Sequence, residues 1–268
     1  DKFSLIDAGD PDEYFPEFDF SKIPHAYGKE QLRKFYQVVP KKDYRTLKLV
    51  FPLPRQIDLY KKKSDRYLSH LIGHESTGSI CQALLANGWS TELEAGEMYA
   101  TSEFSIFGVD INLSPEGEKH IDEIINIIFT YINMIKKEQY PEWIFEECKK
   151  INNINFRFKE SSKPIKHVST VSEHMSPSSG FAAEHVLSGD YVHEEFDREH
   201  IGSLVELLSP ENLIVFHSSK IYSGKTDLTD QWYGTQYSVS DISQEQIDLW
   251  KSSCPVASSL HLPAINQF

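Results

Sequence analysis

Two histidines in this chain are spaced so that they could share a metal ion. They open and close the segment His70-Leu71-Ile72-Gly73-His74. Residues four positions apart lie on one face of a helix, where two imidazoles can bind the same ion. Catalytic zinc needs three protein ligands, however, and two histidines at this spacing are more often surface or structural residues. The spacing by itself is therefore a weak indication of a metal site.

The position of the general base in this segment is occupied by glycine. In the inverted zinc-protease motif H-x-x-E-H, the glutamate between the two histidines activates the zinc-bound water. Gly73 stands at that position here. Glu75 cannot replace it, because the residue that follows His74 on a helix points roughly 100° away from that histidine. We therefore predict no catalytic residue and no metal site in this chain.

Two helices and two strands are expected to position this segment. One helix is predicted over residues 65–74, and a second one follows the capping residues Ser76-Thr77-Gly78 and ends at Asn87-Gly88. Residues 91–96 and 104–113 show the alternation that is typical of strands. A one-residue slip in the second strand, at Phe107-Gly108, predicts a β-bulge.

The rest of the chain has the same mixture of helices and strands. Apolar runs at 32–39 and 46–51 predict a β-hairpin. Ser114-Pro115-Glu116 is typical of a helix start, and isoleucines recur behind it at helical spacing as far as Ile135. Three further helices are predicted: one starts at residue 141, one covers 181–187 and one covers 197–208. A strand is predicted at 213–217.

These patterns predict an α+β fold with two layers, in which helices cover a largely antiparallel sheet. A single domain is expected over residues 29–251. Residues 1–28 are interpreted as an extended lead-in or linker, and residues 252–268, with their prolines and serines, as a C-terminal linker.

The overall composition argues against several classes of partner. A net charge of −13 repels phosphate backbones, so no nucleic-acid partner is expected. No apolar run reaches the roughly 18 residues of a membrane span, so no membrane partner is expected either. Cys81, Cys148 and Cys254 are odd in number and widely spaced, which favours a reducing compartment, the cytoplasm. The start at Asp-Lys-Phe, without an initiator Met, is read as that of a piece of a longer polypeptide.

The residues around the histidine pair resemble a known family. Ser69-His70-Leu71-Ile72-Gly73-His74-Glu75 is similar to the second domain of the insulysin or pitrilysin-type M16 metallopeptidases, and the similarity continues along almost the whole chain. Further matching segments are Val39-Pro40, Phe51-Pro52-Leu53-Pro54, Gly88-Trp89, Glu147-Cys148, Phe156-Arg157-Phe158-Lys159, Pro210-Glu211-Asn212, Gly224-Lys225-Thr226-Asp227, Trp232-Tyr233-Gly234-Thr235-Gln236-Tyr237 and Leu262-Pro263. The aromatic residues of the Trp232 segment are expected to serve packing.

This resemblance implies that catalysis and substrate binding are carried out by different domains of a larger enzyme. In the family, four homologous α+β domains enclose a chamber, and the first domain alone carries the intact motif and its zinc ion. The second domain is non-catalytic and holds the amino-terminal end of peptide substrates at an exosite. The third zinc ligand is expected to be replaced here at or near Arg157. The implied partners are peptide substrates and the other domains of the same polypeptide, with no cofactor in this domain.

The resemblance also assigns the exosite to particular residues. The positions that match are His70, Gly73, Glu75, Leu93, Ala95 and Gly96. An extended peptide could add to the edge of the strand at 92–96 through main-chain hydrogen bonds, with its terminal ammonium near Glu75. Gly73 would be needed for the approach of a ligand backbone, or else for a tight contact between helix and strand. Ala95 replaces a family glycine, which would narrow the approach.

Two other functions would make different demands on these residues. A structural or assembly domain, like the inactive subunits of mitochondrial processing peptidase, would need contact surfaces and no exosite. A free-standing zinc hydrolase would need tight, stoichiometric zinc, against which Gly73 and Arg157 argue. An intact H-x-x-E-H elsewhere on the same polypeptide would favour the exosite function.

Overall fold

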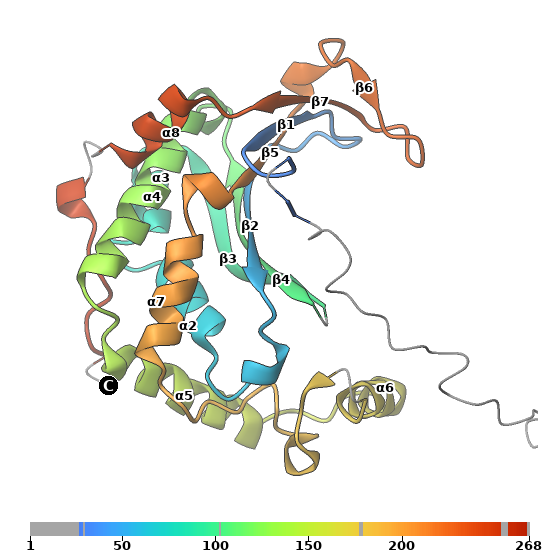
Figure 1. The fold of residues 1–268 in the computed structure, drawn as a ribbon, viewed down its shortest axis with the longest axis vertical. Coiled ribbons are helices and arrows are strands. Elements are labelled where there is room, and N and C mark those ends of the chain that lie inside the picture. The colour runs from blue at the N-terminus through green and yellow to red at the C-terminus, as the bar shows by residue number, and fades with distance from the viewer. Residues whose placement is uncertain (1–26, 29, 102, 177–178, 253–256, 267–268) are drawn as a thin grey trace, which may run out of the picture.

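A computed structural model describes residues 27–28, 30–101, 103–176, 179–252 and 257–266. It contains a mixed sheet with helices on one side (Figure 1). The strands are β1 Lys34–Val38, β2 Thr46–Pro54, β3 Ser90–Ala100, β4 Phe104–Leu113, β5 Ile214–Ser218, β6 Leu228–Thr229 and β7 Gln236–Asp241. The helices are α2 Ser64–Ile72, α3 Ile80–Ala86, α4 Ile121–Lys137, α5 Glu142–Arg157, α6 Pro164–His174, α7 Arg198–Leu207 and α8 Gln244–Lys251. The predicted α+β class is confirmed.

The strands follow the order β3-β4-β2-β5-β1-β7-β6, and the only parallel neighbours among them are β1 and β5. The hairpin predicted for residues 32–51 is therefore wrong. β1 pairs with β5 and β7, whereas β2 pairs with β4 and β5, so the strand from residues 214–218 separates the two. The hairpin was predicted because β1 and β2 are neighbours in the sequence. In the structure β5, which is distant in the sequence, pairs with both of them.

The core lies between the sheet and the helices that cover it (Figure 1). Alternate residues of β2 and β4 point into it, and the helix-spaced isoleucines of α4 pack against them. The buried residues of the two strands include Leu47, Leu49, Phe51, Leu53, Phe107, Val109, Ile111 and Leu113. Leu260, within the segment interpreted as a linker, is also buried in this core. Among the described residues, no helix is long and apolar enough to cross a membrane.

The predicted bulge lies in the neighbouring strand. The buried positions of β4 alternate without a slip, because Ser105 faces the core and Ile106 faces the other way. The register shifts fall in β3, between Ser90 and Glu92 and between Glu97 and Tyr99. The bulge was predicted in β4 because the apolar Ile106 was expected to face the core. The structure instead has Ser105 facing the core.

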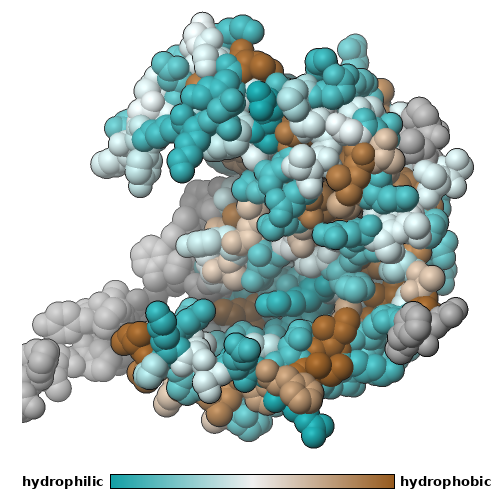
Figure 2. Space-filling model, turned by 180° about the vertical axis from the view of Figure 1, so that it is seen from behind, coloured by the Kyte–Doolittle hydropathy of each residue, from teal (hydrophilic) through white to brown (hydrophobic). Residues whose placement is uncertain are grey.

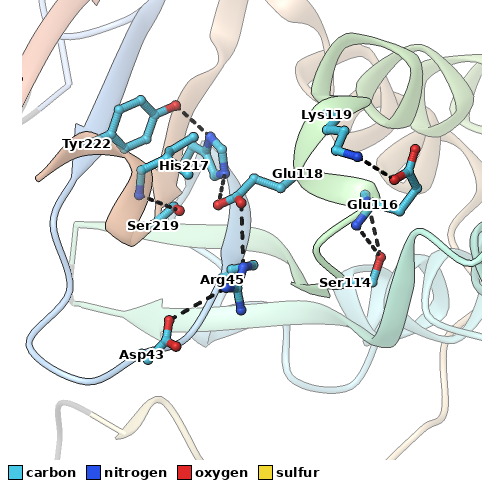
Figure 3. A network of polar contacts seen from close by, with 11 residues as sticks. Asp43, Arg45, Ser114, Glu116, Glu118, Lys119, His217, Ser219 and Tyr222 are labelled. Carbon is cyan, nitrogen blue, oxygen red and sulfur yellow. Dashed lines mark hydrogen bonds and ion pairs between the residues drawn. The ribbon is translucent and has the colours of Figure 1, made fainter.

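The turn before α4 also differs from the prediction. Ser114 Oγ accepts the N–H of Gly117 at 2.9 Å, which starts the 3-10 turn Gly117–Lys119, and α4 itself begins at Ile121. The same turn presents Glu118 to a buried polar network (Figure 3). There Glu118 lies 3.5 Å from Arg45 and 3.9 Å from His217, whose Nδ1 is 2.7 Å from the Tyr222 hydroxyl. The network ties the turn to the start of β2 and to β5.

Two aromatic residues expected in the packing are on the surface. Trp232 is 79% exposed and Tyr233 is 77% exposed. The Gly234 turn that presents them has φ of 65°, which favours glycine. The predicted packing role is therefore wrong for these two residues, whereas Tyr237 of the same segment stacks on Tyr36 with a centroid distance of 6.4 Å.

Candidate functional site

The two histidines of the motif do not share a helix face. α2 ends at Ile72, and Gly73 is its C-cap with φ −90° and ψ 2°. The Gly73 N–H donates to Ser69 O at 2.9 Å, and the chain then leaves the helix before His74. The prediction of a helix through His74 is therefore wrong at its last two residues. Because Gly73 does not lie inside the helix, it does not carry the cost of a helix-interior glycine.

The environments of both histidines favour the neutral imidazole. Burial lowers the pKa of His70, and the charge of Glu147 acts in the opposite direction. Burial lowers the pKa of His74 as well, with smaller contributions from His70 and His261. His74 Nδ1 accepts the N–H of Ser76 at 3.1 Å, while its Nε2 is buried and finds no partner among the described residues. One ring nitrogen of His74 is thus already engaged within the protein.

Zinc does not fit the residues at this place. The described part of the chain holds no group of three His, Cys, Asp or Glu side chains that could bind a metal ion. The carboxylate whose charge reaches His70 is Glu147, on α5. Arg157 is ten residues further along the same helix, about 15 Å away along its axis, so it does not stand beside His70 as we expected. Glu147 is distant from the motif in sequence, and only the fold brings it near His70.

A β-carbon at Gly73 would collide with the backbone of α2 itself. A β-carbon at this residue would lie 2.9 Å from Ser69 O, 3.4 Å from Ala95 N and 3.5 Å from Ala95 Cβ. The first distance is too short for an ordinary contact, so the backbone would have to shift. The distances to Ala95 are those of ordinary contact, so they do not decide between the two roles weighed for Gly73. They show that Ala95 Cβ lies toward the end of α2.

The strand β3 is at the edge of the sheet formed by the described strands. It pairs with β4 from Ser90 to Ala100, and its other side has no strand neighbour in that sheet. The side chain of Leu93 is buried, with 3% exposure, so this residue can offer only backbone groups to a ligand. Gly96 lies against α2, because a β-carbon there would be 3.0 Å from Ser69 Oγ.

The structure therefore brings together most of the predicted peptide-binding residues. Gly73 and Ala95 are in contact, and Gly96 adjoins the residue before His70. Glu75 is exposed in the loop between α2 and α3. Its charge reaches Cys81, where burial and this carboxylate raise the pKa of the thiol. The end of α2 thus adjoins an edge strand and is followed in the chain by an exposed carboxylate.

Comparison with known proteins places the chain in a family. Residues 8–152 match the family described as "Peptidase M16 inactive domain", and residues 156–268 match "Middle or third domain of peptidase_M16". The chain belongs to the peptidase M16 family. Its fold agrees with this assignment, since the M16 structure "Crystal Structure of pitrilysin" superposes with a TM-score of 0.82 at 20% identity, over 90% of this chain and 25% of that one.

Curated M16 relatives are considerably longer than this chain. Insulin-degrading enzyme of Homo sapiens is 36% identical over 262 residues, which cover 95% of this chain and 25% of that protein. Nardilysin of Pongo abelii is 32% identical over 262 residues, which cover 96% of this chain and 22% of that protein. The chain thus spans about a quarter of the M16 relatives that it matches, and it corresponds to a non-catalytic part of them.

Restoring the missing glutamate is not expected to create a peptidase. The Gly73→Glu chain should cleave no fluorogenic peptide, because it still lacks a three-ligand zinc site and because a side chain at 73 collides with Ser69 O. Hydrolysis is measured with and without added zinc, and zinc binding by calorimetry. Cleavage by the Gly73→Glu chain that disappears both with a chelator and on the further substitution His70→Ala would contradict this expectation.

Proposed function

We propose that this chain is the non-catalytic, peptide-holding exosite domain of an insulysin-like zinc metalloendopeptidase that degrades small peptides. Zinc and the catalytic base then belong to another domain of the same polypeptide. The match to an inactive M16 domain and the name of the relative, insulin-degrading enzyme, support the proposal. So does the fact that three quarters of that relative lie outside the matched region.

The observation that carries this proposal is the position of β3. An edge strand has unpaired backbone groups, and an extended peptide can use them to add one more strand to the sheet. The predicted segment Leu93–Gly96 belongs to such a strand, and α2 supports it from one side. Main-chain pairing depends little on peptide sequence, so unrelated peptides are expected to compete for the site.

A free amino terminus provides the orientation of the bound peptide. Glu75 is exposed, and its carboxylate is available to accept charge-assisted hydrogen bonds from a terminal ammonium. Such a site offers few hydrogen bonds and has to offset the lost freedom of the peptide. Micromolar or weaker affinity is therefore expected for this chain alone.

Acetylation of the peptide amine should weaken binding about tenfold. The modification removes the positive charge that pairs with Glu75, and hydrogen bonds to charged groups contribute about 1.5–3 kcal/mol. Affinity is measured by fluorescence anisotropy with a carboxyl-terminally labelled peptide, free or acetylated at its amino terminus. Glu75→Gln should reduce the difference between the two peptides.

The exposed Glu199 on α7 gives a matched control for this measurement. Glu199→Gln removes the same charge from a helix outside the α2–β3 junction, so it should leave the preference for a free amine unchanged. Chemical-shift mapping should find perturbed resonances in 70–75 and 93–96. Equal binding of free and acetylated peptides, or perturbations located elsewhere, would rule out the exosite and favour the assembly function.

One feature favours assembly as a second function. The second half of α5 and much of α6 carry apolar side chains in contact with solvent, and no residue of α6 is buried. The exposed members are Ile151 at 44%, Ile154 at 57%, Phe156 at 41%, Phe158 at 72%, Ile165 at 75%, Val168 at 62% and Met175 at 68%. Exposed apolar patches of this kind mark contact surfaces. The other domains of the same polypeptide are the proposed partners.

The cytoplasm remains the proposed compartment. Cys81 and Cys148 are both free and buried. Burial raises the pKa of the Cys148 thiol to about 11, which keeps it protonated and unreactive. Such cysteines are compatible with a reducing environment. Localising the tagged parent protein in cells tests this part of the proposal.

A further inference from the structure

A charged cavity opens directly beyond the predicted peptide-binding segment. Its volume is about 500 Å³, and it lies between the first turns of α2, the end of β3, α6 and the segment that follows α6. Seen from behind, the molecule is hollowed between its body and the lower rim to which α6 belongs (Figure 2). Glu97, the residue after Gly96, is part of the cavity wall. A peptide that lies along β3 would therefore reach this cavity.

The least exposed charged residue of this cavity is a lysine with acidic residues around it but no ion pair among the described residues. Lys63 lines the cavity but is only 7% exposed. Its backbone has φ 47° at the N-cap of α2, which fixes where the side chain begins. Within the described part of the chain, its ammonium makes no hydrogen bond or ion pair. Burial lowers the pKa of Lys63 and the charge of Arg66 lowers it further, whereas the charges of Asp65, Asp190 and Glu97 raise it by smaller amounts. An unpaired buried charge is unfavourable, and an incoming anion would relieve it.

A neighbouring histidine reports the sign of the potential at this depth. His193 is 3% exposed, and its pKa is lowered to about 4, first by burial and then by the charges of Lys63, Lys149 and Arg66. The Asn152 amide lies 3.0 Å from His193 Nδ1. If the amide nitrogen donates there, the ring proton is on Nε2, which is buried without a partner among the described residues. Burial is the larger cause of the lowered pKa, and the three charges that add to it are all positive.

The carboxylates of the cavity are nearer to solvent. Glu97, Glu173 and Asp190 are exposed, whereas Asp65 is half-buried. Exposed charges are screened by water and salt, so their effect at the depth of Lys63 is reduced. Desolvation and the charge of Asp65 raise the pKa of Glu97, whereas the charges of Arg66 and Lys63 lower it. The interior therefore favours an anion, although acidic residues outnumber basic ones around the mouth.

We propose that this cavity is a subsite for an acidic side chain, in which Lys63 binds the carboxylate of an Asp or Glu residue of the peptide held along β3. The inference rests on the proposed exosite. A strand advances about 3.3 Å per residue, so the four steps from Leu93 to Glu97 cover about 13 Å. The acidic residue should therefore stand about four to six positions from the free amino terminus.

The test is a comparison of peptides with the purified 268-residue chain. Labelled peptides with a free amine carry one Glu at position three, four, five, six or seven, in a background that is otherwise Gln and Ala. Fluorescence anisotropy should show that Glu at one position from four to six binds about five- to tenfold more tightly than Gln at the same position. Lys63→Met should remove this preference, and Lys63→Arg should retain it.

Lys225 gives the matched control, because it is exposed and makes no ion pair within the described residues. Lys225→Met removes the same charge, and the preference for Glu should persist. Lys63→Met should melt at the same or a higher temperature than the unaltered chain, since it removes an unpaired buried charge. If that variant does not fold, Lys63→Gln takes its place in the same comparison.

The results separate this subsite from the exosite on which it rests. Dependence on the free amine without any preference for Glu would overturn the subsite and leave the exosite intact. A peptide with Lys could instead bind more tightly than one with Glu at the same position, and Glu97→Gln could abolish that preference. This result would mean that the carboxylates at the mouth determine the specificity of the cavity, and it would also overturn the subsite. Absence of binding by every peptide would overturn both.

Discussion

Replacing Trp250 with alanine is expected to lower the free energy of unfolding by about 3–5 kcal/mol. Trp250 is fully buried on α8, and its indole ring stacks on Phe129 of α4 with a centroid distance of 6.5 Å. The indole N–H donates to Asp122 Oδ1 at 3.0 Å, so truncation also leaves that carboxylate without its donor. Urea unfolding followed by circular dichroism measures the change without depending on tryptophan fluorescence.

Trp232 supplies the control for this prediction. It is 79% exposed, so Trp232→Ala removes the same side chain from the surface and should change the free energy of unfolding by at most about 0.5 kcal/mol. Equal losses in the two variants would mean that the docking of α8 onto α4 does not stabilise the domain in the way described.

Acidification is expected to destabilise the chain, and His193 should account for about 3 kcal/mol of the loss. Its pKa is about 4 in the folded protein, mainly because the ring is buried, against about 6.5 in an unfolded chain. Between these values the unfolded state binds the additional proton. The stabilisation is therefore fully present above about pH 6.5 and is lost as the pH falls toward 4. Unfolding free energies measured by urea titration at several pH values test this.

His193→Gln should flatten this part of the pH profile, because no imidazole remains to be protonated. The variant loses some stability at pH 7, so the slope with pH is the quantity to compare. His167→Gln, on the exposed surface of α6, should leave the slope unchanged. An unaltered slope in His193→Gln would show that other groups, such as the buried His217, determine the acid response.

Elements that bury one side regularly could be predicted from the sequence. The isoleucines of α4 recur at helical spacing because that helix covers the sheet, and β4 alternates because one face is buried. α6 has no buried residue and therefore no apolar period that could reveal it. α8 was missed as well, although Ser243 and Gln246 form a capping box that a search for this signal would have found.

The candidate site shows the same limit. The order of residues from His70 to Glu75 supplied the resemblance, but the end of α2 at Ile72, with Gly73 as its C-cap, appears only in the structure. The proximity of Glu147 to His70 depends on how α5 packs beside α2, and no local pattern reports it. The placement of Lys63 in the cavity wall is likewise a product of tertiary structure.

The insertion of β5 between β1 and β2 has a consequence for how the chain is made. Synthesis proceeds from the amino terminus, so both neighbours of β5 exist long before residues 214–218 emerge. Until then each has an open edge that is able to pair with another chain. The boundary between the two family matches, near residues 152–156, falls before β5. A product that stops there would lack the strand that joins the two parts of its sheet, and we expect it to aggregate or to require a chaperone.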